Sequence, residues 1–288
     1  MAAALDLGTL DGPVLLFGGP YSNLQATLAL KDAAARHGIP AERVICTGDM
    51  VAYCADPGPT VDLIRAWGCH VVLGNCEESL GAGSTDCGCG FAEGSPCDLL
   101  SQQWFAHASA QLSPGQKAWM ADLPHALTFR LGGARIAVVH GHARDISEWV
   151  FASTPEEDKA AALDALGVDA VIAGHSGLPF SQVLADGRLW HNPGVIGVPA
   201  NDGTSRVWYS LLEPVGDALI LRHLALTYDH RTAIQRMAEN GLPGAYAAAL
   251  ASGLWPSLDV LPRTEETATG KPLAPTEVLW TPPHRHVA

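Results

Sequence analysis

Four short runs of apolar, β-type residues are each followed within three residues by a polar side chain that can bind a metal ion. The runs are ERVIC, CHVVL, RIAVV and VDAVIAG, and the polar residues after them are Asp49, Asn75, His140 and His175. In open α/β sheets, ligands bind at the rim formed by the carboxyl ends of parallel strands. We therefore expect these four residues to meet at one rim, which constrains the fold more than any other feature of the chain.

The donor atoms of these four residues suit one kind of ligand. A carboxylate, an amide oxygen and two imidazoles together favour a divalent first-row transition metal such as Zn, Fe or Mn. A single histidine at a strand end is more often a hydrogen-bonded rim residue than a ligand. All four residues in this order are harder to explain without a metal, so we predict a site made of Asp49, Asn75, His140 and His175.

The order of the expected elements favours an α/β fold. Apolar periodicity predicts strands over 13–17, 42–49 and 69–75, separated by helices over 24–37 and 60–67. Such a β-α-β-α-β series predicts parallel strands joined by right-handed crossovers. Later segments predict paired strands and helices, the last of them over 230–252. We expect one α/β domain over 1–261 with two sheets, a β-sandwich flanked by helices. The Pro- and Thr-rich tail over 262–288 is expected to be peripheral or poorly ordered.

Charge and hydropathy narrow the range of partners that we expect for this chain. The formal net charge is −13, and no basic stripe is present to neutralise a phosphate backbone, so we expect no nucleic-acid partner. The apolar runs are too short to cross a bilayer, so we expect no membrane partner either. The N-terminus lacks a basic region typical of signal peptides, which favours a cytoplasmic location. We expect a small-molecule substrate, and the sequence leaves a homo-oligomer open.

Cysteines cluster beside the second strand-end block. Of the seven cysteines, four lie within 22 residues: Cys76, Cys87, Cys89 and Cys97. In a chain without a secretion signal, such clustering indicates metal or thiol chemistry before disulfides. Residues 78–98 are also rich in glycine and interrupt the α/β pattern. A loop of this length is either functional or disordered, and we expect it to cover the site.

The sequence resembles the calcineurin-like metallophosphoesterases, specifically their small bacterial single-domain branch. The resemblance spans roughly residues 13–250 and depends on the ordered blocks GGPYSNLQA, TGDMVAYCADP, GNCE, VVHGHA, AGHSG and HNPGVIGVP. The corresponding family blocks are (S/D)DxHGN, GDxVxYGPDP, GN(H)(D/E), HG, GHTH and NPGSVG. The resemblance implies a four-layer α/β/β/α fold and a centre with two metal ions.

Departures from the family pattern fall on one of the two implied ions. That ion takes its own ligands from positions that are Gly19, Tyr21 and Gly177 in this chain. The resemblance implies that the other ion is held by Asp49, Asn75, His140 and His175. It also implies that the family histidine which protonates the leaving oxygen is Cys76 here. The sequence therefore predicts one intact metal site and one lost site.

Several side chains are candidates to take over the lost functions. Cys76 or Tyr21 could assist the leaving group, with Asp49 as the anchor of the catalytic ion. Additional ligands could rebuild the lost site, and the candidates are Cys54, Cys76, Cys87, Cys89, Cys97 and His142. Alternatively, the loop cysteines form a separate zinc site or pair under oxidation, Tyr21 is an aromatic plug, and His142 only supports a ligand. Ser22 and Asn23 precede a helix and could bind a substrate anion, although Asn23 could equally be a helix cap.

Three functions remain open from the sequence. The first is a metal-dependent hydrolase that resembles phosphoesterases and cleaves a phosphomonoester or phosphodiester with a metal-activated water. The second is changed chemistry on the same fold, with one metal or a cysteine-ligated Fe, Cu or Zn acting on a non-phosphate substrate. The third is a non-catalytic metal-binding protein. Where the family often carries an arginine after the NPG block, this chain has the uncharged residues Ala200 and Asn201, so we expect a reduced ability to hold a phosphate.

Overall fold

The computed structural model describes residues 4–283 and contains two six-stranded sheets. In the first sheet the strand order is β1 (Leu5–Thr9), β5 (Ala126–Leu131), β6 (Ala134–Val139), β7 (Ala170–Ala173), β9 (Leu189–Asn192) and β8 (Phe180–Val183). In the second it is β12 (Thr276–Trp280), β11 (Ala218–Leu226), β10 (Val207–Val215), β2 (Val14–Phe17), β3 (Val44–Cys46) and β4 (His70–Val71). Both sheets are mixed, and β2, β3 and β4 are parallel as expected.

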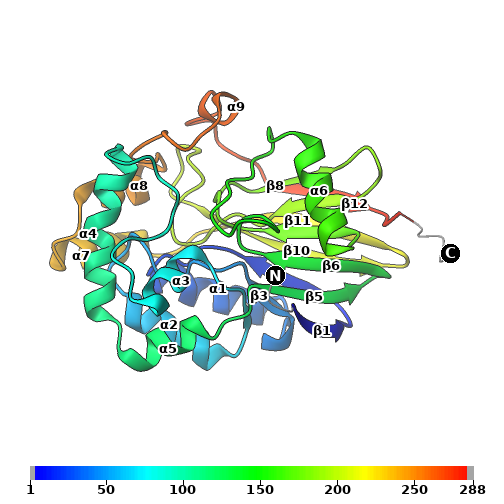
Figure 1. Ribbon diagram of the computed structural model, residues 1–288, viewed down its shortest axis with the longest axis horizontal. Coiled ribbons are helices and arrows are strands. Elements are labelled where there is room, and N and C mark those ends of the chain that lie inside the picture. The colour runs from blue at the N-terminus through cyan, green and yellow to red at the C-terminus, as the bar shows by residue number, and fades with distance from the viewer. Residues whose placement is uncertain (1–3, 284–288) are drawn as a thin grey trace.

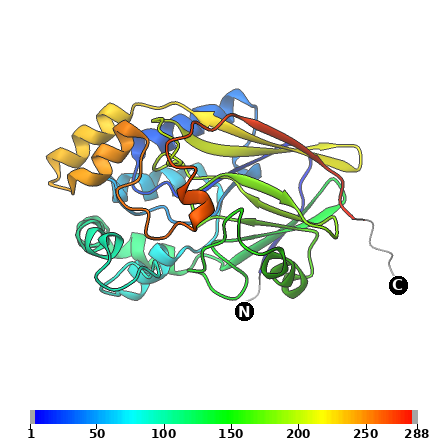
Figure 2. The same ribbon diagram turned by 90° about the horizontal axis from the view of Figure 1, so that it is seen from above.

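The sheets pack face to face, with helices on both outer sides (Figures 1 and 2). Side chains on a strand alternate between its two faces, so Val14 and Leu16 of β2 point into the layer between the sheets. Leu15 and Phe17 point the other way, into the core beneath the helices. The result is the expected helix–sheet–sheet–helix sandwich.

Most helices lie on the outer side of the second sheet or in the segment of the chain that follows its strand β4. They are α1 (Leu24–Arg36), the short η1 (Ala41–Arg43), α2 (Pro57–Trp67), α3 (Asn75–Ala82), α4 (Pro96–Gln111), α5 (Pro114–Ala121), α7 (His230–Glu239) and α8 (Gly244–Ser252). Helix α6 (Glu156–Leu166) covers the first sheet, where Ala162 and Leu163 pack against Val171 and Ala173. None of the helices within residues 4–283 is long and apolar enough to cross a membrane.

Several boundaries differ from the sequence prediction. The helix expected over 230–252 is two helices, because Gly241 adopts a positive φ of 67° and Pro243 precedes α8. The strand expected over 69–75 is only two residues long, because Asn75 already starts α3. Helices α3 and α4 take up both ends of the cysteine-rich stretch, which leaves 83–95 as its loop. Strand β1 was not predicted at all.

The C-terminal tail is not a loose extension. After the short helix α9 (Arg263–Glu266), residues 276–280 form β12, which pairs antiparallel with β11 along five residues. Trp280 is only 2% exposed, and its indole N–H donates to the Gly187 carbonyl at 2.7 Å. The tail thus closes one edge of the second sheet, contrary to the expectation of a peripheral or poorly ordered segment. The residues after 283 lie outside the described part of the chain.

Candidate metal centre

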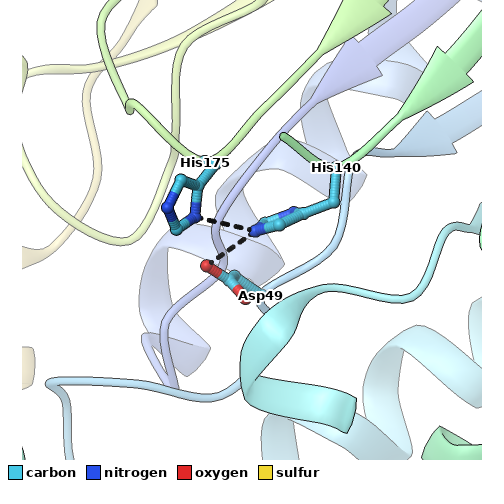
Figure 3. Close-up of side chains that lie close together, drawn as sticks. All are labelled: Asp49, His140 and His175. Carbon is cyan, nitrogen blue, oxygen red and sulfur yellow. Dashed lines mark hydrogen bonds and ion pairs between the residues drawn. The ribbon is translucent and has the colours of Figure 1, made fainter. Parts of the chain in front are cut away.

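The four predicted ligands lie at the carboxyl ends of strands from both sheets. Asp49 follows β3 and Asn75 follows β4, whereas His140 follows β6 and His175 follows β7. The Nε2 atom of His140 lies 3.3 Å from Asp49 Oδ2, 3.0 Å from Asn75 Oδ1 and 3.1 Å from His175 Nδ1. Figure 3 shows three of these side chains pointing toward one another. All four residues are buried.

Hydrogen bonding around this cluster leaves its central atoms in need of a cation. His140 Nδ1 lies 2.6 Å from the Thr47 carbonyl, which only accepts, so the ring proton of neutral His140 is on Nδ1. The Asn75 amide nitrogen donates to the Cys87 carbonyl at 2.9 Å, which turns its oxygen toward His140. The lone pair of His140 Nε2 then faces a carboxylate oxygen, an amide oxygen and a second imidazole. Either a proton on His140 or a bound metal ion satisfies this arrangement.

The pKa shifts follow from the same geometry. Burial alone would lower the pKa of His140, but the Asp49 carboxylate and the Thr47 carbonyl outweigh burial and raise it. Burial alone would raise the pKa of Asp49, but the His140 and His175 rings outweigh it and lower it. Burial and the neighbouring His140 lower the pKa of His175 to about 3, so His175 is neutral and its ring can act as a ligand. The donor set therefore fits a divalent transition metal, with all four lone pairs facing inward.

The backbone is bent to bring these donors together. Asp49 and His175 both have positive φ, of 57° and 56°, which is uncommon for residues other than glycine. Gly48 and Gly74 make the close approach possible, since a Cβ atom at Gly48 would lie 2.8 Å from His140 Nδ1 and one at Gly74 would lie 2.5 Å from Asp49 Oδ1. Non-glycine residues held in this region cost of the order of 1–3 kcal/mol each, and such strain concentrates at functional sites.

Comparison with known proteins identifies the family. A model of the calcineurin-like phosphoesterase superfamily domain matches residues 23–213, about two thirds of the chain. The chain belongs to this superfamily. An uncharacterized protein of Methanocaldococcus jannaschii is 24% identical over 238 residues, which cover 77% of this chain and 90% of that protein.

Two solved structures share the superfamily fold. A hypothetical protein from Pyrococcus horikoshii has a TM-score of 0.70 at 16% identity, covering 84% of this chain and 99% of that chain. A metallophosphoesterase from Sphaerobacter thermophilus has a TM-score of 0.65 at 21% identity, covering 88% and 100%. At these identities the likeness establishes the fold. Membership in the calcineurin-like superfamily in turn favours a metal-dependent hydrolase of phosphoesters.

An aromatic ring lies against Gly19, one of the positions that the family resemblance links to a second ion. A Cβ atom added at Gly19 would overlap the Tyr21 ring, so the ring occupies the place of any larger side chain at Gly19. Gly177, at the third position, faces Trp255 and Val195 instead of a ligand. Burial is the main cause that raises the pKa of Tyr21, and the negative charge of Asp49 raises it further, so the Tyr21 hydroxyl stays protonated. This position is compatible with both roles that the sequence left open for Tyr21, an aromatic plug and a proton donor.

The cysteine candidates lie around the centre without joining it. Among the described residues, the group of histidine, cysteine and acidic atoms within 4.8 Å of one another consists of Asp49, His140 and His175 alone. Cys87 and Cys89 are joined in a disulfide, and Cys89 Sγ accepts from the Asn75 amide at 3.3 Å. Burial, Asp49 and Glu77 raise the pKa of Cys76, which keeps it a thiol.

Two further cysteine candidates lie farther out. Burial raises the pKa of Cys54, whose thiol faces the Gly197 carbonyl at 3.7 Å. Burial also raises the pKa of Cys97, which lies in α4 close to Ser257. Neither thiol is therefore ionised at neutral pH in this structure.

The other predicted site residues have structural partners. His142 stacks on Trp190 and contacts Glu148 and the Asp158 carbonyl, away from the metal cluster. Asn23 caps α1 through a bond from the Ala26 N–H at 3.1 Å, and its amide donates to Gly197 and Tyr228. The Ser22 hydroxyl is buried without a hydrogen-bond partner. Neither Ser22 nor Asn23 lines the pocket next to His175.

Glu77 is one residue that sequence reasoning missed. Its buried carboxylate accepts from the backbone N–H groups of Asp49 at 2.7 Å, Met50 at 2.7 Å and Gly74 at 3.0 Å. These three bonds hold the turn that carries Asp49 against the start of α3, which carries Asn75. An acidic residue in the first turn of a helix is the available sequence signal, and it occurs here directly after the GNC block.

A pocket opens beside His175 on the outer side of the cluster. Its volume is about 60 Å³, and it is lined largely by aromatic rings. They come from five parts of the chain and are Tyr21, Tyr53, Phe91, Trp149, Tyr246 and Trp255. The Trp149 ring lies 4.1 Å from the His175 ring, between centroids. Apart from Tyr21, none of these residues was predicted, because loops and a helix that are distant in sequence form the pocket.

Proposed function

We propose that the protein is a metal-dependent hydrolase that holds one catalytic divalent ion with Asp49, Asn75, His140 and His175 and cleaves a phosphoester. The observation that carries this proposal is the convergence of four lone pairs from two sheets, with distances of 3.0–3.3 Å around His140 Nε2. A divalent ion bound there would polarise a phosphoryl oxygen and lower the pKa of a water. Zn, Fe and Mn all suit these ligands.

The protein's own groups have separate roles in this proposal. Thr47 fixes the tautomer of His140 through its carbonyl, and Glu77 fixes the turn that carries Asp49. Tyr21 lines the pocket and keeps its proton, so it is the better placed donor to a leaving oxygen. Cys76 also keeps its proton, but it is buried and does not line the pocket.

A second candidate is hydrolysis of a substrate that is not a phosphate. In the part of the chain that the structure describes, no lysine or arginine lines the pocket beside His175. A phosphate dianion bound there would have the single metal ion as its main counter-charge. Two-metal hydrolases, in contrast, hold the phosphate between two cations. An ester or amide would need less positive charge than a phosphate, which supports this alternative.

One paired experiment separates the candidates. Metal content is measured by elemental analysis, and turnover of bis-p-nitrophenyl phosphate and p-nitrophenyl phosphate is measured for wild type, Asp49→Ala and His142→Ala. The proposal expects metal and turnover in wild type and His142→Ala, and loss of both in Asp49→Ala. His142 is a matched control because it is a buried histidine near the centre that contacts none of its ligands.

Other outcomes point to the alternatives. Stoichiometric metal that depends on Asp49, with no turnover of either phosphate ester, would favour a non-phosphate substrate. Wild-type protein that binds no metal and has no turnover would refute the hydrolase. Turnover that survives Asp49→Ala would place the reaction elsewhere in the molecule.

A further inference from the structure

The pocket beside His175 differs from a phosphate site in its composition. Six aromatic rings and several aliphatic side chains form most of its wall, and the other polar side chains are His175, Ser176, Ser257 and Cys97. Among residues 4–283, no lysine, arginine, aspartate or glutamate lines it. Because phosphate sites usually offer cationic side chains or a helix N-terminus, this wall is built for another part of the substrate.

We propose that this pocket binds an uncharged aromatic ring of the substrate, next to the bond that is cleaved. The inference builds on the proposed hydrolase, because His175 is both a metal ligand there and part of the pocket wall. The substrate class is then a phosphoester of an aromatic alcohol, with the ring between the tryptophan walls and the scissile group toward the ion.

The walls are held in place before any ligand binds. The Trp255 indole N–H donates to the Pro199 carbonyl at 2.7 Å, and its backbone N–H donates to Asn201 Oδ1 at 2.9 Å. Tyr53 stacks on Tyr246 with 4.5 Å between centroids and meets the edge of Tyr21 at 4.8 Å. Fixed aromatic surfaces lower the entropic cost of binding, and aromatic contacts add about 0.5–1.5 kcal/mol beyond buried area.

Charge excludes the two other ligand types that such rings could bind. A quaternary ammonium would suit an aromatic cage, but here it would approach the divalent ion held by His175 and be repelled. Among the described residues, the pocket wall offers an anion no lysine or arginine, so an anionic group in this pocket would have no side-chain counter-charge.

The test measures binding separately from turnover. The probe is 4-nitrobenzyl alcohol, an uncharged single-ring compound, titrated into metal-loaded protein and followed by saturation-transfer NMR. We expect saturable binding that is weakened about tenfold by Trp149→Ala or by Trp255→Ala, which lie in different loops. Leu254→Ala is the matched control, because Leu254 is 40% exposed, adjoins Trp255 and does not line the pocket.

Two competition measurements complete the test of the aromatic pocket. Inorganic phosphate and tetramethylammonium are tested as competitors, and competition by tetramethylammonium that depends on the two tryptophans would overturn the inference. Absence of saturable probe binding, or binding unchanged in both tryptophan variants, would also overturn it. Probe binding that persists in Asp49→Ala supports the pocket even if hydrolysis is absent in every variant. Turnover without probe binding would leave the hydrolase standing and reject the pocket.

Discussion

At the residue scale, Gly19 and Tyr21 form one steric unit. Gly19 has a positive φ of 39°, and the Tyr21 ring fills the space that a side chain at Gly19 would need. A metal-binding aspartate at Gly19 is therefore incompatible with a tyrosine at Tyr21. In the proposed one-ion site, the missing second ion and this part of the aromatic wall would both follow from the same pair of residues.

The pair predicts a non-additive stability effect. Gly19→Ala is expected to destabilise the protein by about 2–4 kcal/mol, because it adds backbone strain and a clash with the ring. In a Tyr21→Ala background the same change should cost at least about 1 kcal/mol less. Urea unfolding of the four proteins of this double-mutant cycle gives the coupling directly. Equal costs in both backgrounds would show that the ring is not the obstacle.

A second residue-scale prediction concerns protons. The metal needs the lone pair of His140 Nε2. Because Asp49 raises the pKa of His140, protons compete with the ion for this atom even at pH values above the usual histidine pKa of about 6.5. The apparent affinity for Zn²⁺ should therefore fall as pH decreases from about 8 to about 6. The lowered pKa of Asp49 keeps its carboxylate charged throughout this range.

The measurement is titration of Zn²⁺ across this pH range in buffers with different ionisation enthalpies. Release of close to one proton per ion at the lower pH values is expected. An affinity independent of pH would mean that His140 does not bind the ion through Nε2.

At the element scale, β12 shows how a short terminal strand contributes to the sheet. Trp280 points into the layer between the sheets, where it packs among the apolar side chains of both sheets. The adjacent Leu279 points outward and is 67% exposed. The same strand therefore contains a core residue and a surface residue of similar chemical character.

The alternation predicts a large loss of stability for a substitution at one position of β12 and almost none for a substitution at its neighbour. Trp280→Ala is expected to lower the free energy of unfolding by about 3–5 kcal/mol, because it leaves a cavity and an unpaired Gly187 carbonyl. Leu279→Ala should change it by less than about 0.5 kcal/mol. Chemical denaturation of both variants tests this. Similar losses in both would place the destabilisation in strand pairing and not in the core.

The sequence predicted the parts of the fold that depend on local pattern. Asp49, Asn75, His140 and His175 could be named because each follows an apolar run, and strand ends converge by topology alone. Trp149 and Trp255 could not, since their position beside His175 depends on loop conformations that no local periodicity encodes. The tail was misjudged because TEVLW is one short apolar run inside a Pro- and Thr-rich stretch, and its pairing partner lies more than 50 residues away.

At the scale of the whole molecule, the metal centre joins the two sheets. Asp49 and Asn75 come from strands of the second sheet, and His140 and His175 come from strands of the first. An ion held by all four residues therefore acts across the interface between the sheets. A ligand that binds only the folded state stabilises that state in proportion to the logarithm of its concentration over its Kd.

Metal loading should therefore stabilise the entire domain. At a free ion concentration of about 100 times Kd, we expect a gain of about 2.7 kcal/mol and a corresponding rise in Tm, reversed by a chelator. Asp49→Ala should abolish the rise, whereas His142→Ala should retain it. Differential scanning calorimetry with and without the ion measures the shift. A rise that persists in Asp49→Ala would indicate a stabilising site elsewhere.

The contact between Trp149 and His175 has an optical consequence. With 4.1 Å between ring centroids, the indole lies against a ligand of the proposed ion. Emission from this tryptophan would be quenched when a paramagnetic ion such as Cu²⁺ or Co²⁺ binds, and left largely intact by Zn²⁺. The protein thus carries its own fluorescent reporter of which metal it has taken up.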